Sequence, residues 1–427
     1  MLKKRILAIP VIAGVLALGG AGLAIAASTA PTYKVCVKAD IVYGATAKGA
    51  CPAGTKAVLI NSQGPVGPRG SAGARGAKGA TGSQGPTGTR GPTGAQGPAG
   101  QPPKPDLSRV ATLDWWGGAY SGGSYGFDHP EGVAFDGTHI WVTNAIGNSV
   151  TELDASGSWV RTVTNTSCAS CNFNGPEGIA FDGTHIWVAN PGGNSVTELD
   201  ASDGSWVRNL TGGSYGFDGP QGITFDGTHV WVANEGGSVT EFSASDGTWV
   251  RTPAGGSYGF DDPEGIAFDG TDIWVTNLVG NSVTELSASD GTKVQTITDS
   301  TCASCNFDAP EGVAFDGTHI WVTNYGGNSV TELSASNGSW VRTITDSSCT
   351  SCSFSNPIGI AYDGAHIWAT NYGGASVTEL NASDGSWVRT LSSGSYGFNQ
   401  PTGIAFDGTH IWVTNYAGAS VTDLPAG

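Results

Sequence analysis

Basic residues are scarce in the last three quarters of the chain. Residues 107–427 contain seven Lys/Arg and thirty-four Asp/Glu, a net charge of −27, whereas residues 1–106 contain twelve Lys/Arg and two Asp/Glu, a net charge of +10. A surface this acidic repels phosphate groups, so the composition argues against a nucleic-acid partner. Cations, cationic ligands and basic proteins remain as partners.

Helical periodicity is also absent from this region, because no ten-residue window there repeats its apolar residues about every 3.6 positions. Helix is therefore excluded as a major component. The region has no serine at a nucleophile elbow with His and Asp partners, no phosphate-binding glycine loop and no helical His/Glu zinc motif. The many glycines and serines belong to turns.

Seven copies of one segment occupy the region instead, each similar to PEGVAFDGTHIWVTN followed by NSVTELDASDGSWVRT. Their central aromatic residues recur every 43 to 47 positions, at Phe135, Phe181, Phe225, Phe268, Phe315, Tyr362 and Phe406. The first copy contains four β-rich segments separated by turn residues, Gly132–Phe135, His139–Thr143, Ser149–Leu153 and Trp159–Val163. Four antiparallel strands in each copy predict an all-β fold, a seven-bladed β-propeller over residues 108–427.

The two ends of the repeat region predict a closed ring. The last copy stops after Ser420–Leu424, one strand short, and Arg109–Leu113 ahead of the first copy resembles the fourth segment Trp387–Leu391 of the sixth. We therefore expect Arg109–Leu113 to complete the last blade, which removes an exposed sheet edge.

The N-terminal quarter predicts an exported protein. Residues 1–26 combine a basic start, an apolar run and small residues, which indicates a signal peptide or, given the length of the run, a membrane anchor. Residues 27–63 form a small module in which Cys36 and Cys51 are expected to form a disulfide. Residues 64–100 carry glycine at every third position without interruption, which predicts a collagen-like triple-helical stalk and hence a homotrimer. A disordered linker is the alternative for this tract, and residues 101–107 connect it to the propeller.

The other six cysteines form three CxxC pairs, each in a loop between two copies, at Cys168/Cys171, Cys302/Cys305 and Cys349/Cys352. Elsewhere this loop has the shorter sequence GGSYGFD or a close variant. An oxidising compartment favours a local disulfide in each CxxC loop. A four-cysteine zinc site shared by the last two pairs and a redox site are the alternatives.

Residues that recur in nearly every copy are expected to serve the blade, because a catalytic residue is normally needed once. This applies to the turn aspartates such as Asp136, to tryptophans such as Trp141, which we expect between blades, and to a repeated histidine. The histidine occurs as His139, His185, His229, His319, His366 and His410, with Asp272 in its place in the fourth copy. A ring of repeated lectin-like pockets, strengthened by avidity, is the functional alternative.

Positions that differ between copies are more informative about function. The residues after the loop proline are Glu131, Glu177, Gln221, Glu264, Glu311, Ile358 and Thr402. These positions begin the innermost strands, so they should gather around one mouth of the channel. The four glutamates (Glu131, Glu177, Glu264 and Glu311) are candidate ligands for Ca²⁺ or Mg²⁺, with a solvated acidic rim as the alternative. His129, the histidine outside the repeated position, is the candidate catalytic residue.

The repeated pattern GIAFDG…IWVTN…NSVTEL resembles the YVTN, NHL and streptogramin-lyase-like propellers over about residues 108–427. Resemblance to the streptogramin B lyases implies a catalytic histidine directly after the loop proline and a metal-binding glutamate at the end of the second strand. Here those positions hold Glu131 and Asn144 with their counterparts, and neither His129 nor Glu235 restores the pattern. Residues 27–100 resemble the N-terminal modules of actinobacterial collagen-like proteins.

Together these features predict a secreted or cell-surface binding or adhesion protein with trimeric propeller heads and a glycan or surface protein as ligand. Membrane contact is expected only through residues 1–26. One alternative is a metal-dependent lyase or hydrolase with the four glutamates around a cation and His129 as acid/base. Another is a structural component of a surface coat. A lectin-like binder should repeat an exposed aromatic and polar pocket around the ring.

Overall fold

The computed structural model describes residues 118–426 except 393 and 395, together with three strands nearer the N-terminus. These strands, β1 (Thr32–Lys38), β2 (Ile41–Tyr43) and β3 (Lys56–Asn61), form an antiparallel sheet in the order β2-β1-β3. The chain divides into two units, residues 1–92 and 93–427, which are described separately. Within the described part of the chain, no helix has the length and hydrophobicity needed to cross a bilayer.

Several predictions for the N-terminal quarter lie outside the described residues. They are the signal peptide or anchor at residues 1–26, the collagen-like tract at 64–100 and the linker at 101–107. The Cys36–Cys51 disulfide belongs with them, since neither side chain is described. These four features stay predictions.

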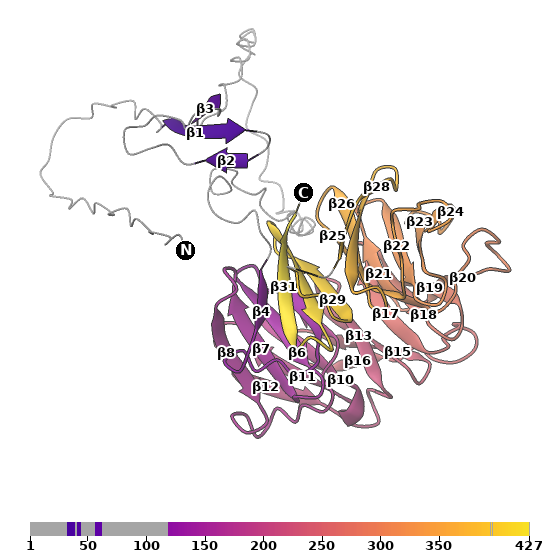
Figure 1. The fold of residues 1–427 in the computed structure, drawn as a ribbon. Helices are drawn as coiled ribbons and strands as arrows, with labels where there is room; N and C mark the ends of the chain where they lie inside the picture. Colours follow the sequence, from indigo (N-terminus) through magenta and orange to yellow (C-terminus); the bar gives the residue numbers. More distant parts are fainter. Residues whose placement is uncertain are drawn as a thin grey trace, which may run out of the picture. The chain divides into compact units, whose positions relative to one another are not determined.

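Seven four-stranded antiparallel sheets form the seven predicted blades, which follow one another around a ring in Figure 1. The first strands, which define blades 1 to 7, are β5 (Pro130–Phe135), β9 (Ile179–Phe181), β13 (Pro220–Phe225), β17 (Pro263–Phe268), β21 (Pro310–Phe315), β25 (Pro357–Tyr362) and β29 (Pro401–Phe406). The second strands are β6 (His139–Asn144), β10 (His185–Asn190), β14 (His229–Asn234), β18 (Asp272–Asn277), β22 (His319–Asn324), β26 (His366–Asn371) and β30 (His410–Asn415).

The third strands are β7 (Ser149–Asp154), β11 (Ser195–Asp200), β15 (Ser238–Ser243), β19 (Ser282–Ser287), β23 (Ser329–Ser334), β27 (Ser376–Asn381) and β31 (Ser420–Pro425). The fourth strands are β8 (Trp159–Thr164), β12 (Trp206–Leu210), β16 (Trp249–Arg251), β20 (Lys293–Thr298), β24 (Trp340–Thr345), β28 (Trp387–Ser392) and, in blade 7, β4 (Ala119–Ser121). The described residues contain one short 3-10 helix, η1 (Pro191–Gly193). The expectation of an all-β propeller is confirmed.

A segment ahead of the first repeat closes the ring, as expected, but the predicted segment was wrong. β4 (Ala119–Ser121), rather than Arg109–Leu113, pairs with β31, and Tyr120 lies opposite Val421. Tyr120 stacks on Trp412 with ring centroids 5.7 Å apart, and so takes part in the packing between blades 7 and 1. The spacing explains why β4 is the closing strand. Tyr120 precedes the loop tyrosine Tyr125 by five residues, just as Leu391 of the fourth strand of blade 6 precedes Tyr396.

The repeated tryptophans pack between blades, as predicted. Trp141 of blade 1 is fully buried against Phe173 and Ile186, which belong to blade 2 and the loop leading into it. Its Nε1 donates to Asp136 Oδ2 at 2.8 Å, while Asp136 Oδ1 accepts from the backbone amide of His139 at 2.6 Å. The turn aspartate therefore connects the Asp-Gly turn to the core between the blades.

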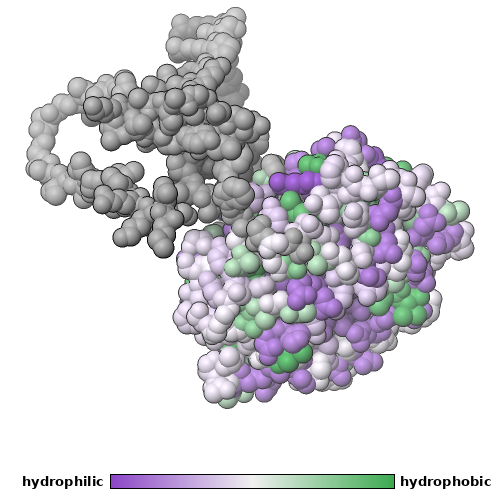
Figure 2. Space-filling view, viewed as in Figure 1, coloured by the Kyte–Doolittle hydropathy of each residue, from purple (hydrophilic) through white to green (hydrophobic). Residues whose placement is uncertain are grey.

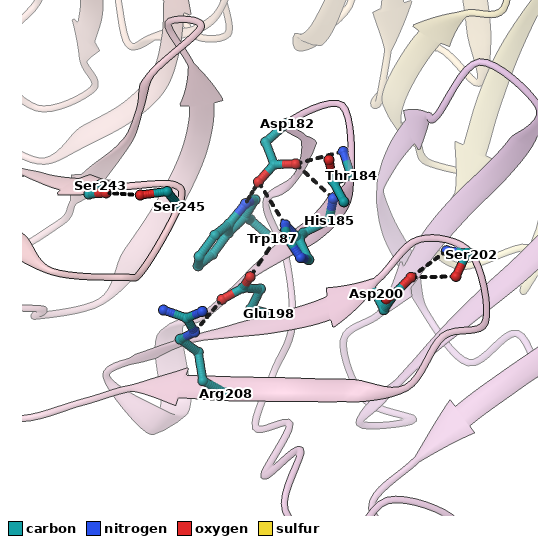
Figure 3. Close-up of polar contacts among 10 residues, drawn as sticks. All are labelled: Asp182, Thr184, His185, Trp187, Glu198, Asp200, Ser202, Arg208, Ser243 and Ser245. Carbon is teal, nitrogen blue, oxygen red and sulfur yellow. Dashed lines mark hydrogen bonds and ion pairs between the residues drawn. The ribbon is translucent and has the colours of Figure 1, made fainter.

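The repeated histidine belongs to a polar network inside blades 1, 2, 3, 5 and 6, shown for blade 2 in Figure 3. His185 Nδ1 lies 3.2 Å from Asp182 Oδ2 and 3.4 Å from Glu198 Oε1. Arg208 Nε lies 2.7 Å from Glu198 Oε2, so the buried carboxylate has a cationic partner. Burial raises the pKa of Glu198, and Arg208 and His185 oppose this shift. The repetition of this network supports a structural role for the histidines.

Candidate functional site: the acidic mouth of the channel

The residues after the loop prolines converge at one mouth of the central channel. Together with the glycines that follow them, they line a cavity of about 240 Å³. In blade order these residues are Glu131, Glu177, Gln221, Glu264, Glu311, Ile358 and Thr402. Beyond the glycines the channel is apolar, lined by residues such as Val133, Ile179 and Ile223 around about 220 Å³. The acidic side chains therefore lie at the mouth and not in the apolar segment next to it.

Close approach of the inner strands positions these side chains. A Cβ on Gly132 would collide with the carbonyl oxygen of Glu177 in the next blade, and the equivalent glycines meet the next blade in the same way, ending with Gly403 against Glu131. Thr143 Oγ1 also donates to the carbonyl oxygen of Glu177 at 2.7 Å. The backbone of each mouth residue thus packs against the glycine of the preceding blade, while its side chain lines the cavity.

Burial and repulsion from neighbouring carboxylates raise the pKa values of the four mouth glutamates. Burial, followed by repulsion from Glu177 and Glu311, raises the pKa of Glu131 to about 8. Burial and several neighbouring carboxylates, Glu311 first, raise the pKa of Glu264 to about 9. Burial is also the main cause for Glu311, whose pKa is about 8, and for Glu177, whose pKa is about 7.

No Lys or Arg among the described residues forms an ion pair with these four side chains. Only Glu177 has a side-chain partner that lowers its pKa, a hydrogen bond from Gln221. The mouth therefore holds carboxyl groups that lack a cation to balance them.

A second ring of residues lies at the mouth and was not predicted from the sequence. Tyr325, Tyr372 and Tyr416 line a cavity of about 380 Å³ with Glu131, Glu177 and Glu311. They belong to a position directly after the last residue of the second strand, occupied in blade order by Ala145, Pro191, Glu235, Leu278, Tyr325, Tyr372 and Tyr416. This variation between copies was the signal that could have identified the ring. The tyrosines of blades 5 to 7 thus gather on one side of the mouth, in the same cavity as Glu131, Glu177 and Glu311.

The tightest acidic cluster also differs from the predicted one. Glu235, Asp262 and Glu264 each offer a carboxylate oxygen within 4.8 Å of the others, whereas only Glu264 of this group was predicted. Glu235 Oε1 also accepts a hydrogen bond from Gln221 Nε2. Among the described residues, the four predicted glutamates share a cavity without forming such a close group themselves.

His129 lies at the rim and outside the cavity lining. Its Nδ1 is 2.9 Å from Asp128 Oδ1, and its ring packs edge-on against Tyr416 with centroids 4.6 Å apart. Its backbone has a φ of 54°, and other blades also have positive φ at this position, for example Asp262 at 61°. In the described region His129 makes no ion pair with a mouth glutamate. The structure does not bring the candidate acid/base together with the candidate metal ligands.

The position expected to hold a metal-binding glutamate in the lyases has a structural amide here. Asn144 is fully buried, and its Nδ2 donates to Ser149 Oγ at 3.1 Å and Thr151 Oγ1 at 3.0 Å. Its six counterparts are also fully buried. These asparagines fasten the turn between the second and third strands.

All three predicted CxxC disulfides are present, Cys168–Cys171, Cys302–Cys305 and Cys349–Cys352. The second cysteine of each pair is fully buried. Since both sulfurs of every pair are bonded to each other, the zinc and redox alternatives are set aside for these loops.

No protein-family model and no curated protein matches the chain. A streptogramin B lyase structure matches with a TM-score of 0.56 and 18% identity, covering 72% of this chain and 96% of the lyase. A catalytically inactive virginiamycin B lyase from Staphylococcus aureus with quinupristin has a TM-score of 0.57 and 18% identity, covering 73% and 99%. Kuenenia stuttgartiensis hydrazine synthase has a TM-score of 0.57 and 19% identity, covering 70% and 96%. The likeness shows a seven-bladed propeller fold similar to that of streptogramin B lyase.

Proposed function

We propose that this protein is an exported, non-catalytic binding protein that presents propeller heads on a collagen-like stalk and binds cations or cationic groups at the acidic mouth. The carrying observation is the convergence of four glutamates without an ion-pair partner among the described residues. A bound cation would stabilise their ionised forms and offset their mutual repulsion. Trimerisation through the stalk would supply valency for adhesion.

The chemistry of the mouth fits two kinds of cation. Carboxylate oxygens suit Ca²⁺ or Mg²⁺, and Glu235, Asp262 and Glu264 are spaced closely enough to share one ion. The tyrosine side of the mouth suits an ammonium group, because aromatic faces attract cations and Glu131 and Glu311 lie in the same cavity. Both modes use binding alone and need no acid/base residue.

A lyase or hydrolase activity is not favoured. The positions that carry the catalytic histidine and the metal-binding glutamate in streptogramin B lyases hold Glu131 and Asn144 with their counterparts. His129 is paired with Asp128 at the rim, outside the residues that line the cavity.

The test is calorimetric titration of the full-length protein with Ca²⁺, Mg²⁺ and tetramethylammonium. We expect saturable binding, weakened about tenfold or more in a Glu131→Gln/Glu264→Gln variant because two ligand charges are removed. An Asp203→Asn/Asp246→Asn variant loses the same net charge at exposed turns and should bind as the wild type does. Absence of saturable heat with all three cations, at a pH where the glutamates are ionised, would rule out the mouth as a cation site.

A further inference from the structure

Exposed tryptophans recur at the outer edge of the propeller. The fourth strand of five blades begins with a tryptophan that is 42–47% exposed, namely Trp159, Trp206, Trp249, Trp340 and Trp387. Each indole Nε1 donates to the side chain three residues later, as Trp387 does to Thr390 Oγ1 at 3.0 Å. The ring is therefore held in one orientation while much of its surface stays open to solvent. Figure 2 shows a mainly polar surface with small, separate hydrophobic patches on the visible face.

In blades 2, 5 and 6 this hydrogen-bond chain continues into a disulfide loop. Thr390 Oγ1, the partner of Trp387, donates to the carbonyl oxygens of Ser351 and Cys352, both at 3.0 Å. In blade 2, Trp206 Nε1 donates to Asn209 Oδ1 at 3.1 Å, and Asn209 Nδ2 donates to the Ser170 carbonyl oxygen at 2.7 Å. Trp340 of blade 5 is joined through Thr343 to Ser304 in the same way. The disulfide loop and the tryptophan thus form one pre-ordered unit.

Two equivalent hollows lie beside these units. The blade 6 hollow has a volume of about 580 Å³ and is lined by Trp387, Phe354 and Ser376, among others. The blade 2 hollow has a volume of about 590 Å³ and is lined by the equivalent Phe173 and Ser195, together with Asn209. Trp206 lies beside this lining and is joined to it through its hydrogen bond to Asn209. The same structural positions build both hollows, which indicates a repeated feature of the fold rather than an isolated surface depression.

Hydroxyl and amide groups dominate both linings, and neither contains a Lys or Arg. The one carboxylate in the linings, Asp346, accepts a hydrogen bond from the backbone amide of Phe354 at 2.9 Å, so its charge is engaged in holding the loop. Asn165 occupies that position in blade 2 and accepts from the Phe173 amide at 2.8 Å. Groups of this kind both donate and accept hydrogen bonds, as a ligand rich in hydroxyls requires.

We propose that the hollows of blades 2 and 6 bind a neutral glycan, with the equivalent surface of blade 5 as a third contact. The apolar C–H face of a hexose would stack on the exposed indole, and its hydroxyls would bond the serine, threonine and asparagine side chains. The absence of basic groups from the linings disfavours an anionic polysaccharide. The order already imposed on the ring lowers the entropic cost of binding.

The arrangement favours a polysaccharide over a single sugar. Sites on separate blades of one head can bind separate stretches of a repeating polymer, and each weak site then adds to the whole by avidity. This inference rests on the proposed role as a binding protein, but its ligand class and its residues differ from those of the acidic mouth.

Affinity electrophoresis of the full-length protein through native gels that contain hydroxyethyl cellulose or galactomannan tests the proposal. We expect retardation by at least one of these neutral polymers. In a Trp206→Ala/Trp387→Ala variant the apparent affinity should fall about tenfold per site, which is the scale of one lost aromatic stack. Both tryptophans are exposed, so the thermal melting point should change little.

The matched control is Trp159→Ala/Trp249→Ala, which removes two similarly exposed tryptophans. Neither lines a hollow, and their hydrogen-bond partners, Thr162 and Thr252, do not line one either, whereas Trp387 lines the blade 6 hollow and Trp206 is bonded to Asn209 in the lining of the blade 2 hollow. The control variant should retain wild-type retardation. Equal losses in both variants would show that any exposed tryptophan suffices and would overturn the assignment to the hollows. Absence of retardation in the wild type with both polymers would overturn the glycan proposal, while cation titration would still judge the mouth separately.

Discussion

The propeller joins its blades with two kinds of loop, which hold the same backbone positions by different means. In four loops a tyrosine stacks on the phenylalanine two residues later, as Tyr215 does on Phe217 with centroids 5.3 Å apart. In the other three the second cysteine of a disulfide replaces the tyrosine, as Cys171 does before Phe173. The pattern of hydrogen bonds is kept, because the carbonyl oxygens of Tyr215 and Cys171 both accept from the third strand of the following blade.

The difference between the loops lies in what they leave at the surface. Tyr215 reaches inward, and its hydroxyl donates to the carbonyl oxygen of Gly247 at 2.6 Å. The disulfide fills less of the core but ties a longer, serine-rich loop beside the fourth strand, where the two hollows lie. An aromatic pair therefore serves the packing and hydrogen bonding of the blade, whereas a disulfide loop combines packing with a polar, accessible surface.

Reduction of the disulfides should have the largest effect, because it destabilises the disulfide loops and leaves the tyrosine loops intact. Each closes a very short loop, so the chain-entropy contribution is about 2 kcal/mol per disulfide. We expect dithiothreitol to lower the free energy of unfolding, measured by chemical denaturation, and to disorder the loops before blades 2, 5 and 6. Replacing Cys168 and Cys171 by serine should lower stability in one loop and reduce the further effect of dithiothreitol.

Zinc and chelators serve as the control for that experiment. Because the cysteines are bonded in pairs, neither zinc nor EDTA should alter the denaturation curve of the oxidised protein through these loops. Stabilisation of the reduced loops by zinc, to the level of the oxidised protein, would contradict a purely disulfide-based design.

Stability should depend on pH through the mouth glutamates and not through the disulfide loops, whose cysteines do not titrate. The folded-state pKa values of Glu131, Glu264 and Glu311 lie at about 8 to 9, above the ordinary value of 4.5. The folded state therefore retains more protons than the unfolded state between these limits, so the contribution of these glutamates to stability is full below about pH 4.5 and is lost as pH rises towards 9. We expect the free energy of unfolding to fall between pH 5 and 9 by more than the ~1.4 kcal/mol that corresponds to one pKa unit.

The contribution of the mouth glutamates to this pH dependence can be measured by comparing two variants. Glu131→Gln/Glu264→Gln should flatten the decline in melting temperature between pH 5 and 9, whereas Asp203→Asn/Asp246→Asn should leave it unchanged. Added Ca²⁺ should protect the wild type more at pH 9 than at pH 6, because only the ionised carboxylates bind it. An unchanged slope in the glutamine variant would assign the decline to the buried blade glutamates, such as Glu198, instead.

Features that recur from copy to copy could be predicted from the sequence, whereas features that depend on how individual strands pair could not. Seven copies of one pattern predicted the blades, the tryptophan packing and the disulfides. The closing strand was misplaced because Arg109–Leu113 resembles a fourth strand in composition, whereas the structure uses the spacing of Tyr120 from the following loop. The position of the mouth glutamates was predicted correctly because each directly follows the loop proline that marks the start of an innermost strand. Tyr325 was not predicted at the mouth, and Glu235 was considered only for the lyase pattern, because only the fold brings their turns to the same mouth.

The smallest expected effect concerns the joints between blades around the mouth. In five blades a threonine on the second strand donates to the carbonyl oxygen of the next mouth residue, as Thr276 does to Glu311 at 2.6 Å, but blades 2 and 3 have Ala189 and Ala233 at this position. Ala233→Thr should supply the missing bond to the Glu264 carbonyl oxygen and raise the free energy of unfolding by about 1 kcal/mol. Ala233→Val, which has nearly the same shape without the hydroxyl, is the control and should give no such gain in chemical denaturation. Equal stabilisation by valine would show that filled volume, rather than the hydrogen bond, secures the inner ring at the mouth.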